Sequence, residues 1–536
     1  MRVAVIGNGP VGQSTALLLA RWGVPVTLLD ERAERDAAGS KSICQQGDVL
    51  DIWDSVGAGR AIAAEGVTWT CARTYYRGRE LFSYTPGRSG ASFPPFVNLS
   101  QSRTEQILDE RIAAEPLIDV RWNSRVTGIA QDGNGVTISA MPASRVTVSG
   151  MPVSGMPVSG MPASGQDIRA DYAVACAGAR GDPVREMLGV EFSGHSFADK
   201  FLICDIKTEL PGWADERRFY FDPPWNPGRQ VLIHPCPGST FRIDWQVPGD
   251  YDLRSDALDA RIRTVIGTRP YRVIWHSVYR FQSKIVDRMR VGRVLLAGDC
   301  AHVFSPFGAR GLNSGVADAE NAAWKLACVL RGWAGPDLLE SYHAERHAAA
   351  LENLAVTRAT MEFLVPQDDE QRERRRTVLA GAASDPELRA MVDSGRLAEP
   401  FWYAASPLTT PDPARPFAGR PPRGALPALA PGVLIPDVPV PFVPAPVPGV
   451  PAPDVPMPGR YRLRALARAG FVLLGADHTN LDHVTAIPMD DGLRKSLDAR
   501  PGELWLIRPD AHVAAILRDP SHVLPALRRT LGSAAR

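Results

Sequence analysis

Short apolar runs separated by glycine-rich turns dominate the start of the chain. Residues 2–6 (Arg-Val-Ala-Val-Ile) and 26–29 (Val-Thr-Leu-Leu) are almost continuously apolar, which favours parallel strands buried on both faces. Between them, residues 13–22 follow a helical pattern that ends at Gly23. The order strand, helix, strand predicts a βαβ unit whose first turn is residues 7–12.

A second turn of this kind lies within residues 292–313. The apolar run 294–297 predicts a strand that leads to Gly298 and Asp299, and a glycine-rich loop then precedes a helix that begins near Asn313. A carboxylate in such a turn accepts hydroxyl hydrogens. The free N–H groups and the dipole at a helix N-terminus favour an electron-rich ligand oxygen. The pattern therefore predicts a site for a polar ligand.

The intervening segment alternates between regular structure and one repetitive insertion. Residues 98–113 predict an amphipathic helix, 120–137 predict two strands joined by a turn at 132–135, and 171–180 predict a core strand. Between 141 and 165 the five-residue unit Met-Pro-Val/Ala-Ser-Gly recurs. Its proline content excludes a helix, and we interpret it as an expanded, mobile hairpin loop without chemistry.

From about residue 190 to 290 the pattern changes to short strands with alternating faces. The clearest is 241–247, where every second residue is apolar. Together with 218–221 and 231–235, it predicts an antiparallel sheet inserted between two halves of a nucleotide-binding domain.

The last part of the chain begins with a proline-rich stretch. Residues 399–459 are crowded with proline, which favours a wrapping or linking segment over a core. Beyond it, the apolar runs 471–474, 484–487 and 504–513 predict strands of a small α/β unit.

Composition narrows the class of protein. The 536 residues are 45% apolar and 22% charged, enough for a large core and more than one domain. With 60 basic and 59 acidic residues the net charge is +1, which favours neither nucleic acid nor a membrane surface as a partner. Seven scattered cysteines show no metal-ligand spacing, so we expect reduced thiols, no metal and a cytoplasmic location. No signal peptide and no membrane span are expected.

The first turn carries the fingerprint G-x-G-x-x-G. Its glycines let the backbone approach a pyrophosphate at the helix N-terminus, and an acid about 20 residues later binds ribose hydroxyls. Asp30 has the better offset for the ribose and Glu31 is the alternative, although Glu31 and Arg32 could equally be solvated loop charges. The βαβ unit therefore predicts dinucleotide binding.

Taken together, residues 7–12, Asp299 and residues 306–313 (Pro-Phe-Gly-Ala-Arg-Gly-Leu-Asn) resemble the single-component FAD-dependent aromatic hydroxylases. These flavoprotein monooxygenases include para-hydroxybenzoate hydroxylase, phenol hydroxylase and 3-(3-hydroxyphenyl)propionate hydroxylase. The likeness covers residues 1 to about 360, and the tail is similar to the thioredoxin-like C-terminal domain of larger members, without a Cys-x-x-Cys pair.

The resemblance implies an α/β fold with a Rossmann-like FAD-binding domain and an inserted, mixed or antiparallel substrate sheet. The implied parts are an FAD-binding domain at 1–185 and 285–395 with the insertion 141–165, a substrate-binding β-sheet domain at 186–284, a proline-rich linking segment at 396–459 and a thioredoxin-like domain at 460–536.

The resemblance also implies roles for particular positions. Asp299 would hold the ribityl chain of FAD, the backbone N–H groups of Leu312 and Asn313 would face the flavin pyrimidine edge, and Pro306 would line the substrate side. Gln101 would lie near the flavin or cap a helix, and Lys41 would lie near the pyrophosphate. The full set of expected cofactor-binding residues is Gly7, Gly9, Pro10, Val11, Gly12, Asp30, Glu31, Arg32, Lys41, Gln101, Gly178, Arg180, Gly298, Asp299, Pro306, Gly308, Gly311, Leu312 and Asn313.

One position departs from the family pattern. Relatives usually carry Asp-Gly where this chain has Ala177-Gly178, and that acid normally helps to bind both FAD and NAD(P)H. Arg180 remains and could contact a phosphate or be a surface arginine. The departure removes one of the contacts to NAD(P)H that the resemblance implies.

The chemistry implied is reduction of FAD by transiently bound NAD(P)H, addition of O2 at flavin C4a, and attack of an electron-rich aromatic carbon on the hydroperoxide. The expected substrate is a small phenolic or polyketide-like aromatic. The alternatives are a tailoring epoxidase or Baeyer–Villiger monooxygenase of a natural-product pathway, and a non-catalytic flavin-binding module. A homo-oligomer formed through the C-terminal unit is a further hypothesis.

No catalytic base can be assigned from the sequence. The weak candidates His302, Tyr220, Tyr279 and His234 could each serve a structural purpose instead. The aromatic residues of the inserted sheet indicate either an apolar pocket roof or a sheet core; these are Trp213, Phe221, Trp225 and Trp245.

Overall fold

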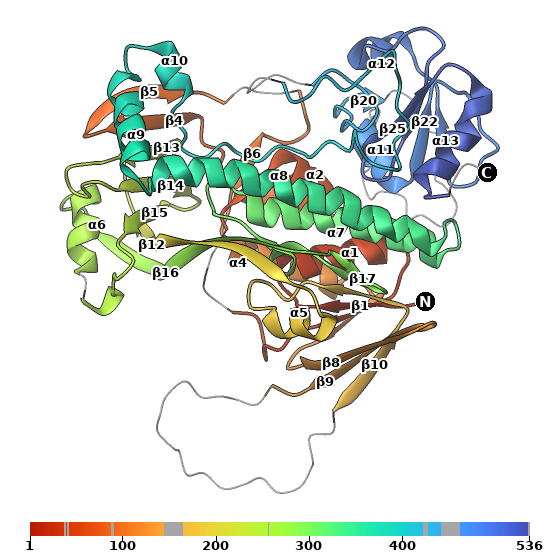
Figure 1. Cartoon of the computed structure of the whole chain (residues 1–536), viewed down its shortest axis with the longest axis horizontal. Helices are drawn as coiled ribbons and strands as arrows, with labels where there is room; N and C mark the ends of the chain where they lie inside the picture. Colours follow the sequence, from red (N-terminus) through yellow and green to blue (C-terminus); the bar gives the residue numbers. More distant parts are fainter. Residues whose placement is uncertain are drawn as a thin grey trace, which may run out of the picture.

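The computed structural model describes residues 1–36, 39, 42–86, 90–143, 165–255, 257–421, 427–440 and 461–533. Figure 1 shows the N-terminal sheet and its helices at the centre and lower right, the inserted sheet on the left and the C-terminal unit at the upper right. Most of the repeat at 141–165, and Lys41, lie outside the described residues.

The N-terminal domain is built on a six-stranded sheet. Its order is β17-β18-β11-β1-β2-β7, parallel except for the β17–β18 pair. The strands predicted at 2–6, 26–29, 171–180 and 294–297 are confirmed. The members are β1 (Val3–Ile6), β2 (Val26–Leu29), β7 (Ile118–Arg121), β11 (Tyr172–Ala175), β17 (Arg290–Val291) and β18 (Val294–Leu296).

Helices cover this sheet, and two of them start beside its strand ends. Helix α1 (Pro10–Arg21) packs against α7 (Arg310–Leu330), and α7 lies beside the long α8 (Glu340–Leu364) (Figure 1). Helix α7 begins three residues before Asn313, because Ala309 adopts a left-handed conformation (φ 56°) that turns the loop directly into the helix. The smaller helices here are α2 (Gly47–Asp54), α3 (Gly59–Glu65) and α5 (Asp182–Leu188).

The helix predicted at 98–113 is confirmed as α4 (Gln101–Ala113). Its cap is Ser100, whose hydroxyl accepts a hydrogen bond from the backbone N–H of Arg103 (3.2 Å), so the cap alternative for Gln101 is wrong. The predicted hairpin is β8 (Arg125–Asp132) and β9 (Gly135–Met141), which pair with β10 (Gln166–Ala170). Strands β3 (Cys44–Gln46) and β6 (Phe96–Asn98) form a separate antiparallel pair.

The inserted domain is an eight-stranded sheet, antiparallel except where β13 pairs with β4. Three strands come from outside residues 186–284 and were not anticipated. The order is β19 (His302–Val303), β16 (Tyr271–Val286), β12 (Phe192–Thr208), β15 (Thr240–Val247), β14 (Gln230–Cys236), β13 (Glu216–Phe221), β4 (Cys71–Tyr76) and β5 (Arg79–Tyr84).

The two faces of this sheet have different surroundings. The alternation predicted along 241–247 is confirmed, and its apolar residues, Trp245 among them, pack with Ile262 and Ile266 of α6 (Leu258–Ile266). The opposite face is turned toward the N-terminal domain, where α9 (Asp369–Gly381) and α10 (Pro386–Ala390) lie near its edge. The face that looks inward is therefore the one on which Arg242 and Asp244 lie.

The C-terminal unit contains a four-stranded sheet of order β23-β22-β24-β25. Residues Ile435 and Val440 of the proline-rich segment are fully buried in its core. Its elements are β20 (Pro439–Val440), β21 (Tyr461–Arg462), α11 (Leu463–Ala469), β22 (Phe471–Leu474), β23 (Val484–Ile487), α12 (Asp491–Leu497), β24 (Leu504–Ile507), β25 (Val513–Leu517) and α13 (Val523–Thr530).

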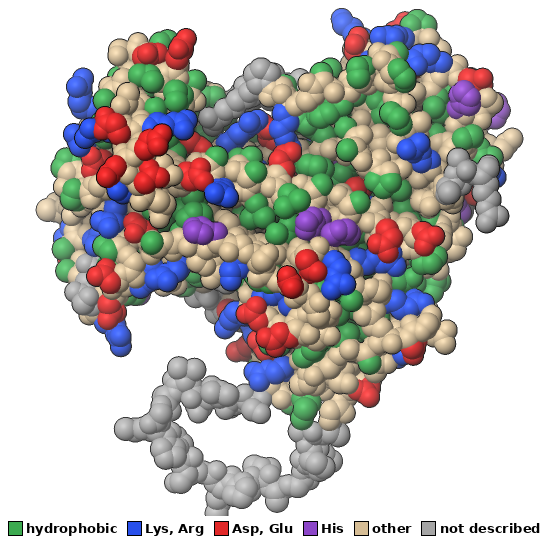
Figure 2. Space-filling model, in the orientation of Figure 1, with side chains coloured by type: hydrophobic (Ala, Val, Ile, Leu, Met, Phe, Trp, Pro, Cys, Tyr) green, Lys and Arg blue, Asp and Glu red, His purple; other side chains and the backbone are tan. Residues whose placement is uncertain are grey.

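The described residues also show how charged side chains and cysteines are distributed. Basic and acidic side chains are interspersed over the face shown in Figure 2. All seven cysteines lie in the described part and are free thiols. In the described part, none of the helices is both long and apolar enough to cross a bilayer. The same residues contain no cluster of three or more side chains that could hold a metal ion.

Candidate functional site

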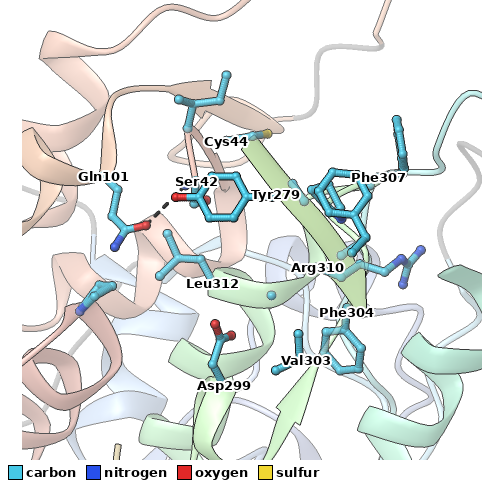
Figure 3. Close-up of a pocket in the computed structure, with 18 of the residues that line it drawn as sticks. Ser42, Cys44, Gln101, Tyr279, Asp299, Val303, Phe304, Phe307, Arg310 and Leu312 are labelled. Carbon is cyan, nitrogen blue, oxygen red and sulfur yellow. Dashed lines mark hydrogen bonds between the residues drawn. The ribbon is translucent and has the colours of Figure 1, made fainter. Parts of the chain in front are cut away.

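A cavity of about 1670 Å³ lies between the six-stranded sheet and the inward face of the eight-stranded sheet. The turn after β1, the loop before α7 and residues 386–399 contribute to its wall. Figure 3 shows Asp299, Leu312, Gln101 and Tyr279 arranged around this space. One cavity thus joins both glycine-rich turns to the inserted sheet.

The turn between β1 and α1 depends on its glycines for different reasons. Gly7 has φ 105°, and a Cβ on it would overlap the carbonyl oxygen of Cys176. A Cβ on Gly12 would overlap the carbonyl oxygen of Gly7, so this glycine allows helix and strand to approach closely. Gly9 has open space at its Cβ position and forms the N-cap of α1 without a side-chain hydrogen bond. The N-terminus of α1 is therefore bare toward the cavity.

Asp30 at the end of β2 stabilises the same turn. One carboxylate oxygen accepts the backbone N–H of Asn8 (2.8 Å), and the other accepts the backbone N–H (2.8 Å) and Nε–H (2.9 Å) of Arg32. Although burial opposes its charge, the hydrogen bonds from Arg32 keep the pKa of Asp30 below its ordinary value. Glu31 is exposed and pairs with Arg125 at 3.1 Å. Both acids line the cavity. Asp30 also holds the turn between β1 and α1 in place.

A further support of this turn was missed by sequence reasoning. Arg35 donates to the carbonyl oxygen of Asn8 (3.0 Å) and to Glu105 of α4 (2.7 Å). No motif marks Arg35, because its partner Glu105 is 70 residues away along the chain. The turn is thus held from β2 and from α4.

The second turn places a carboxylate beside another bare helix N-terminus. Gly298 has φ 60° and leads into the short helix Gly298–Cys300, which contains Asp299. Helix α7 has no side-chain cap, and Gly311 and Leu312 of its first turn line the same cavity as Asp299 (Figure 3). A carboxylate and free N–H groups therefore face one space.

Asp318, inside α7, supports this turn from beneath and was also missed. Its Oδ2 accepts the backbone N–H of Gly298 (3.0 Å) and contacts Nε2 of His302 (2.7 Å), and its Oδ1 accepts Nε–H of Arg346 (2.7 Å). Burial opposes the charge of Asp318, but His302 and Arg346 lower its pKa to about 2. His302 is fully buried in this pair and does not line the cavity.

The other weak catalytic candidates divide into two groups. Tyr220 stacks on Tyr75 with ring centroids 4.6 Å apart and does not line the cavity. Tyr279 and His234 do line it. Burial and two neighbouring arginines lower the pKa of His234 well below its ordinary value, so its imidazole is neutral.

Most of the expected cofactor-binding residues meet at the cavity. Gln101 accepts the backbone N–H of Ser42 (3.2 Å) and donates to Glu105 (2.9 Å). Asn313 lies behind the wall, where its side chain accepts from the backbone of Gln46 (3.0 Å) and donates to the carbonyl oxygen of Cys44 (3.0 Å). The wall includes Gly7, Gly9, Pro10, Val11, Asp30, Glu31, Arg32, Gln101, Gly178, Arg180, Asp299, Pro306, Gly308, Gly311 and Leu312, but not Gly12, Gly298 or Asn313.

Polar residues of the inserted sheet also line the cavity and were not among the predictions. Arg217, Arg242, Asp244 and Trp275 all face it. The sequence pattern could have identified two of them. Because the apolar residues of 241–247 alternate and share one face of the strand, Arg242 and Asp244 must lie on the opposite face.

The geometry fits FAD. Two bare helix N-termini suit the pyrophosphate and an electron-rich ring edge, and the missing side chain of Gly9 leaves the backbone accessible. Asp299 can accept hydroxyl hydrogens of a ribityl chain. The cavity exceeds the roughly 300–1,000 Å³ of an ordinary ligand site, so it has room for a dinucleotide and a second, multi-ring molecule.

Comparison with known proteins agrees with this fit. Residues 1–357 match the family model described as an FAD binding domain. The 6-methylpretetramide 4-monooxygenase of Streptomyces rimosus is 28% identical over 530 residues, covering 96% of this chain and 90% of the relative. A flavin-dependent monooxygenase of Mycobacteroides abscessus is 30% identical over 383 residues, covering 67% of this chain and 73% of the relative.

Solved structures share the fold along nearly the whole chain. The flavin-dependent monooxygenase PieE, in complex with FAD and substrate, superimposes with a TM-score of 0.80 at 21% identity, and 99% of each chain is covered. The rebeccamycin biosynthetic enzyme RebC with reduced flavin gives a TM-score of 0.72 at 20% identity, again with 99% of each chain covered.

Proposed function

We propose a function for this chain, which belongs to the FAD binding domain family. It is an FAD-dependent monooxygenase that uses NAD(P)H and O2 to hydroxylate a phenolic or aromatic polyketide substrate. The observation that carries the proposal is the single cavity, which joins the dinucleotide turn to an aromatic-lined sheet face. The activity in the names of the relatives supports it: 6-methylpretetramide 4-monooxygenase is similar over 96% of this chain.

The residues that would hold FAD follow from the site. The turn at Gly7–Gly12 and the N-terminus of α1 would bind the pyrophosphate, Asp30 or Glu31 the adenosine ribose, and Asp299 the ribityl chain. When bound and reduced, FAD supplies the activation of O2 and the transfer of one oxygen atom.

The chain itself supplies position, electrostatics and exclusion of water. The N-terminus of α7 at Leu312 would stabilise negative charge on a ring edge placed against it. Phe201, Phe281 and Phe307 stack and pack edge to face at one part of the cavity wall, with centroid distances of 4.4–6.0 Å. This apolar wall would hold an aromatic ring system and keep water away from the reacting carbon.

We propose that NAD(P)H binds transiently at the same cavity. Arg180 lines it next to Gly178, so its guanidinium could meet a nucleotide phosphate. This chain has Ala177 at the position where relatives usually carry an acid. Reduction by NAD(P)H is therefore the step of the proposal that needs testing first.

The test is anaerobic mixing of the purified flavoprotein with NADH or NADPH, with and without polycyclic phenols such as 6-methylpretetramide. We expect a particular phenol to accelerate bleaching of the flavin band. After oxygen is admitted, the product should carry one oxygen atom from labelled O2. NMR of the product separates ring hydroxylation from epoxidation and from Baeyer–Villiger insertion. If neither nucleotide bleaches the flavin, the hypothesis of an NAD(P)H-dependent monooxygenase is refuted. The remaining hypothesis is then a non-catalytic flavin-binding module.

We further propose that residues 460–536 form a thioredoxin-like domain. The order β23-β22-β24-β25, with a parallel β22–β23 pair and antiparallel β24 and β25, supports this topology. Since no cysteine follows Cys328 in the sequence, the domain would have no dithiol chemistry of its own. A crystal structure of the full chain, superimposed over this domain on a thioredoxin, will test the topology.

A further inference from the structure

The inward face of the eight-stranded sheet is polar at one part of the cavity wall. His234 on β14 and Asp244 on β15 lie there diagonally, because His234 pairs with Arg242 and Asp244 pairs with Leu232. Diagonal neighbours on one face of adjacent strands are close enough for their side chains to contact one ligand group. Arg217 of β13 also lines this part of the wall.

Two polar atoms of this group have no hydrogen-bond partner among the described residues. Oδ1 of Asp244 and Nδ1 of His234 are both buried and unsatisfied. Their neighbour Arg242 is satisfied, since it forms a bidentate ion pair with Asp205 (2.7 and 2.8 Å). Buried polar atoms are almost always paired in native proteins, so two unpaired atoms at a cavity wall point to a ligand that supplies the missing partners.

The charges around these atoms set what they can exchange. His234 has Arg217 and Arg242 beside it and is neutral, so its ring offers one donor and one acceptor. Burial raises the pKa of Asp244 to about 7, against the opposing charge of Arg242. Near neutral pH its carboxyl can therefore also donate or accept a hydrogen bond.

We propose, on the basis of the proposed function, that His234 and Asp244 recognise a hydroxyl beside a carbonyl oxygen on a fused-ring aromatic substrate. An adjacent donor and acceptor on the protein complement the adjacent acceptor and donor of such a hydroxy-carbonyl group. Leu232 and Phe201 line the same cavity and provide the apolar surface for the rings. The two residues are thus specificity determinants of the substrate site.

The experiment uses the full-length protein with oxidised FAD and no nicotinamide, so that binding is separated from turnover. The probes are danthron, a three-ring quinone whose hydroxyls flank a carbonyl, and anthracene, which has no oxygen. Dissociation constants come from perturbation of the flavin spectrum. The variants are Asp244→Ala and His234→Ala, which remove the hydrogen-bonding groups, and the controls are Asp250→Ala and His276→Ala, which alter exposed residues of the same domain.

We expect each site variant to weaken danthron binding by about tenfold or more, as loss of a hydrogen bond in a buried site does. Anthracene and FAD affinities should stay within about twofold of the wild-type values, as should all affinities of the controls. Absence of danthron binding to the wild type, or equal weakening for danthron and anthracene, would overturn the proposal. Danthron binding as expected without any flavin reduction by NAD(P)H would refute only the proposed function.

Discussion

Glu345 of α8 joins the C-terminal unit to α7 and α8 through a buried network, and Glu345→Gln tests how much this network stabilises the protein. Its carboxylate accepts two hydrogen bonds from Arg508 (2.6 and 2.9 Å), one from Lys325 (2.6 Å) and one from Asn321 (2.8 Å). Arg508 and Lys325 are fully buried. Although burial opposes ionisation, the charges of Arg508 and Lys325 hold the pKa of Glu345 well below its usual range.

The magnitude follows from what the substitution leaves behind. Arg508 keeps its pairing with Asp510 (2.6 Å), but Lys325 loses its anionic partner and an amide N–H₂ now faces two cations. Removing one partner of a buried ion pair costs about 3–5 kcal/mol, so we expect a loss of this size in the free energy of unfolding.

Helix α8 offers a matched control in Glu340, five residues earlier. Glu340 is 71% exposed and pairs with Arg290 at 2.9 Å, so Glu340→Gln should cost no more than about 0.2–1 kcal/mol. The assay is urea unfolding, which gives the free energy of unfolding of each variant. Hydrogen exchange of the C-terminal strands is measured as well, because loss of docking should appear there first. If the two variants lie within about 1 kcal/mol of each other, the reasoning about the buried network is wrong.

Three further predictions concern the cavity. Gly9→Ala should fold normally and bind FAD more weakly, whereas Gly12→Ala should fail to fold because its Cβ overlaps backbone; thermal unfolding and flavin content separate the two. Asp318→Asn should weaken FAD binding by about tenfold, measured by fluorescence titration, while Asp337→Asn on the surface should not. Because the pKa of Asp244 is raised from 3.8 to about 7, the folded state holds an extra proton between these values, and stability falls as pH rises through them. The melting temperature of Asp244→Asn relative to wild type should therefore rise between about pH 5 and about pH 8; a constant difference would contradict the shift.

The parts of the site that sequence predicted are those fixed by local geometry. The turn at 7–12 needs glycine where a side chain would overlap neighbouring backbone, and that demand is visible in the sequence itself. The turn at 298–299 is similar, since a left-handed Gly298 must precede the carboxylate. Gly12 is constrained by Gly7 five residues earlier, and the positive φ angles of Gly7 and Gly298 are properties of single residues, so a local pattern can carry these constraints.

The supporting residues were missed because their partners are distant. Arg35 reaches Glu105, Arg346 reaches Asp318, and Arg508 reaches Glu345 across separations of 70, 28 and 163 residues. An arginine in isolation looks the same whether it is solvated or buried against an acid. Only the packing of α4, α7, α8 and the C-terminal unit distinguishes the two cases.

The same ion pairs show why the C-terminal unit is not a removable module. Arg468 of α11 donates to Glu320 of α7 (2.6 Å) and also pairs with Asp51 of α2, both buried carboxylates. A chain ending near residue 400 would remove Arg468 from Asp51 and Glu320, and would leave Glu345 with Lys325 but without Arg508. Loss of a partner from a buried ion pair is strongly destabilising. Misfolding of such a fragment would therefore be explained by the loss of these ion pairs and would say nothing about contacts between subunits. For this reason the homo-oligomer hypothesis has to be tested by sedimentation of the full chain.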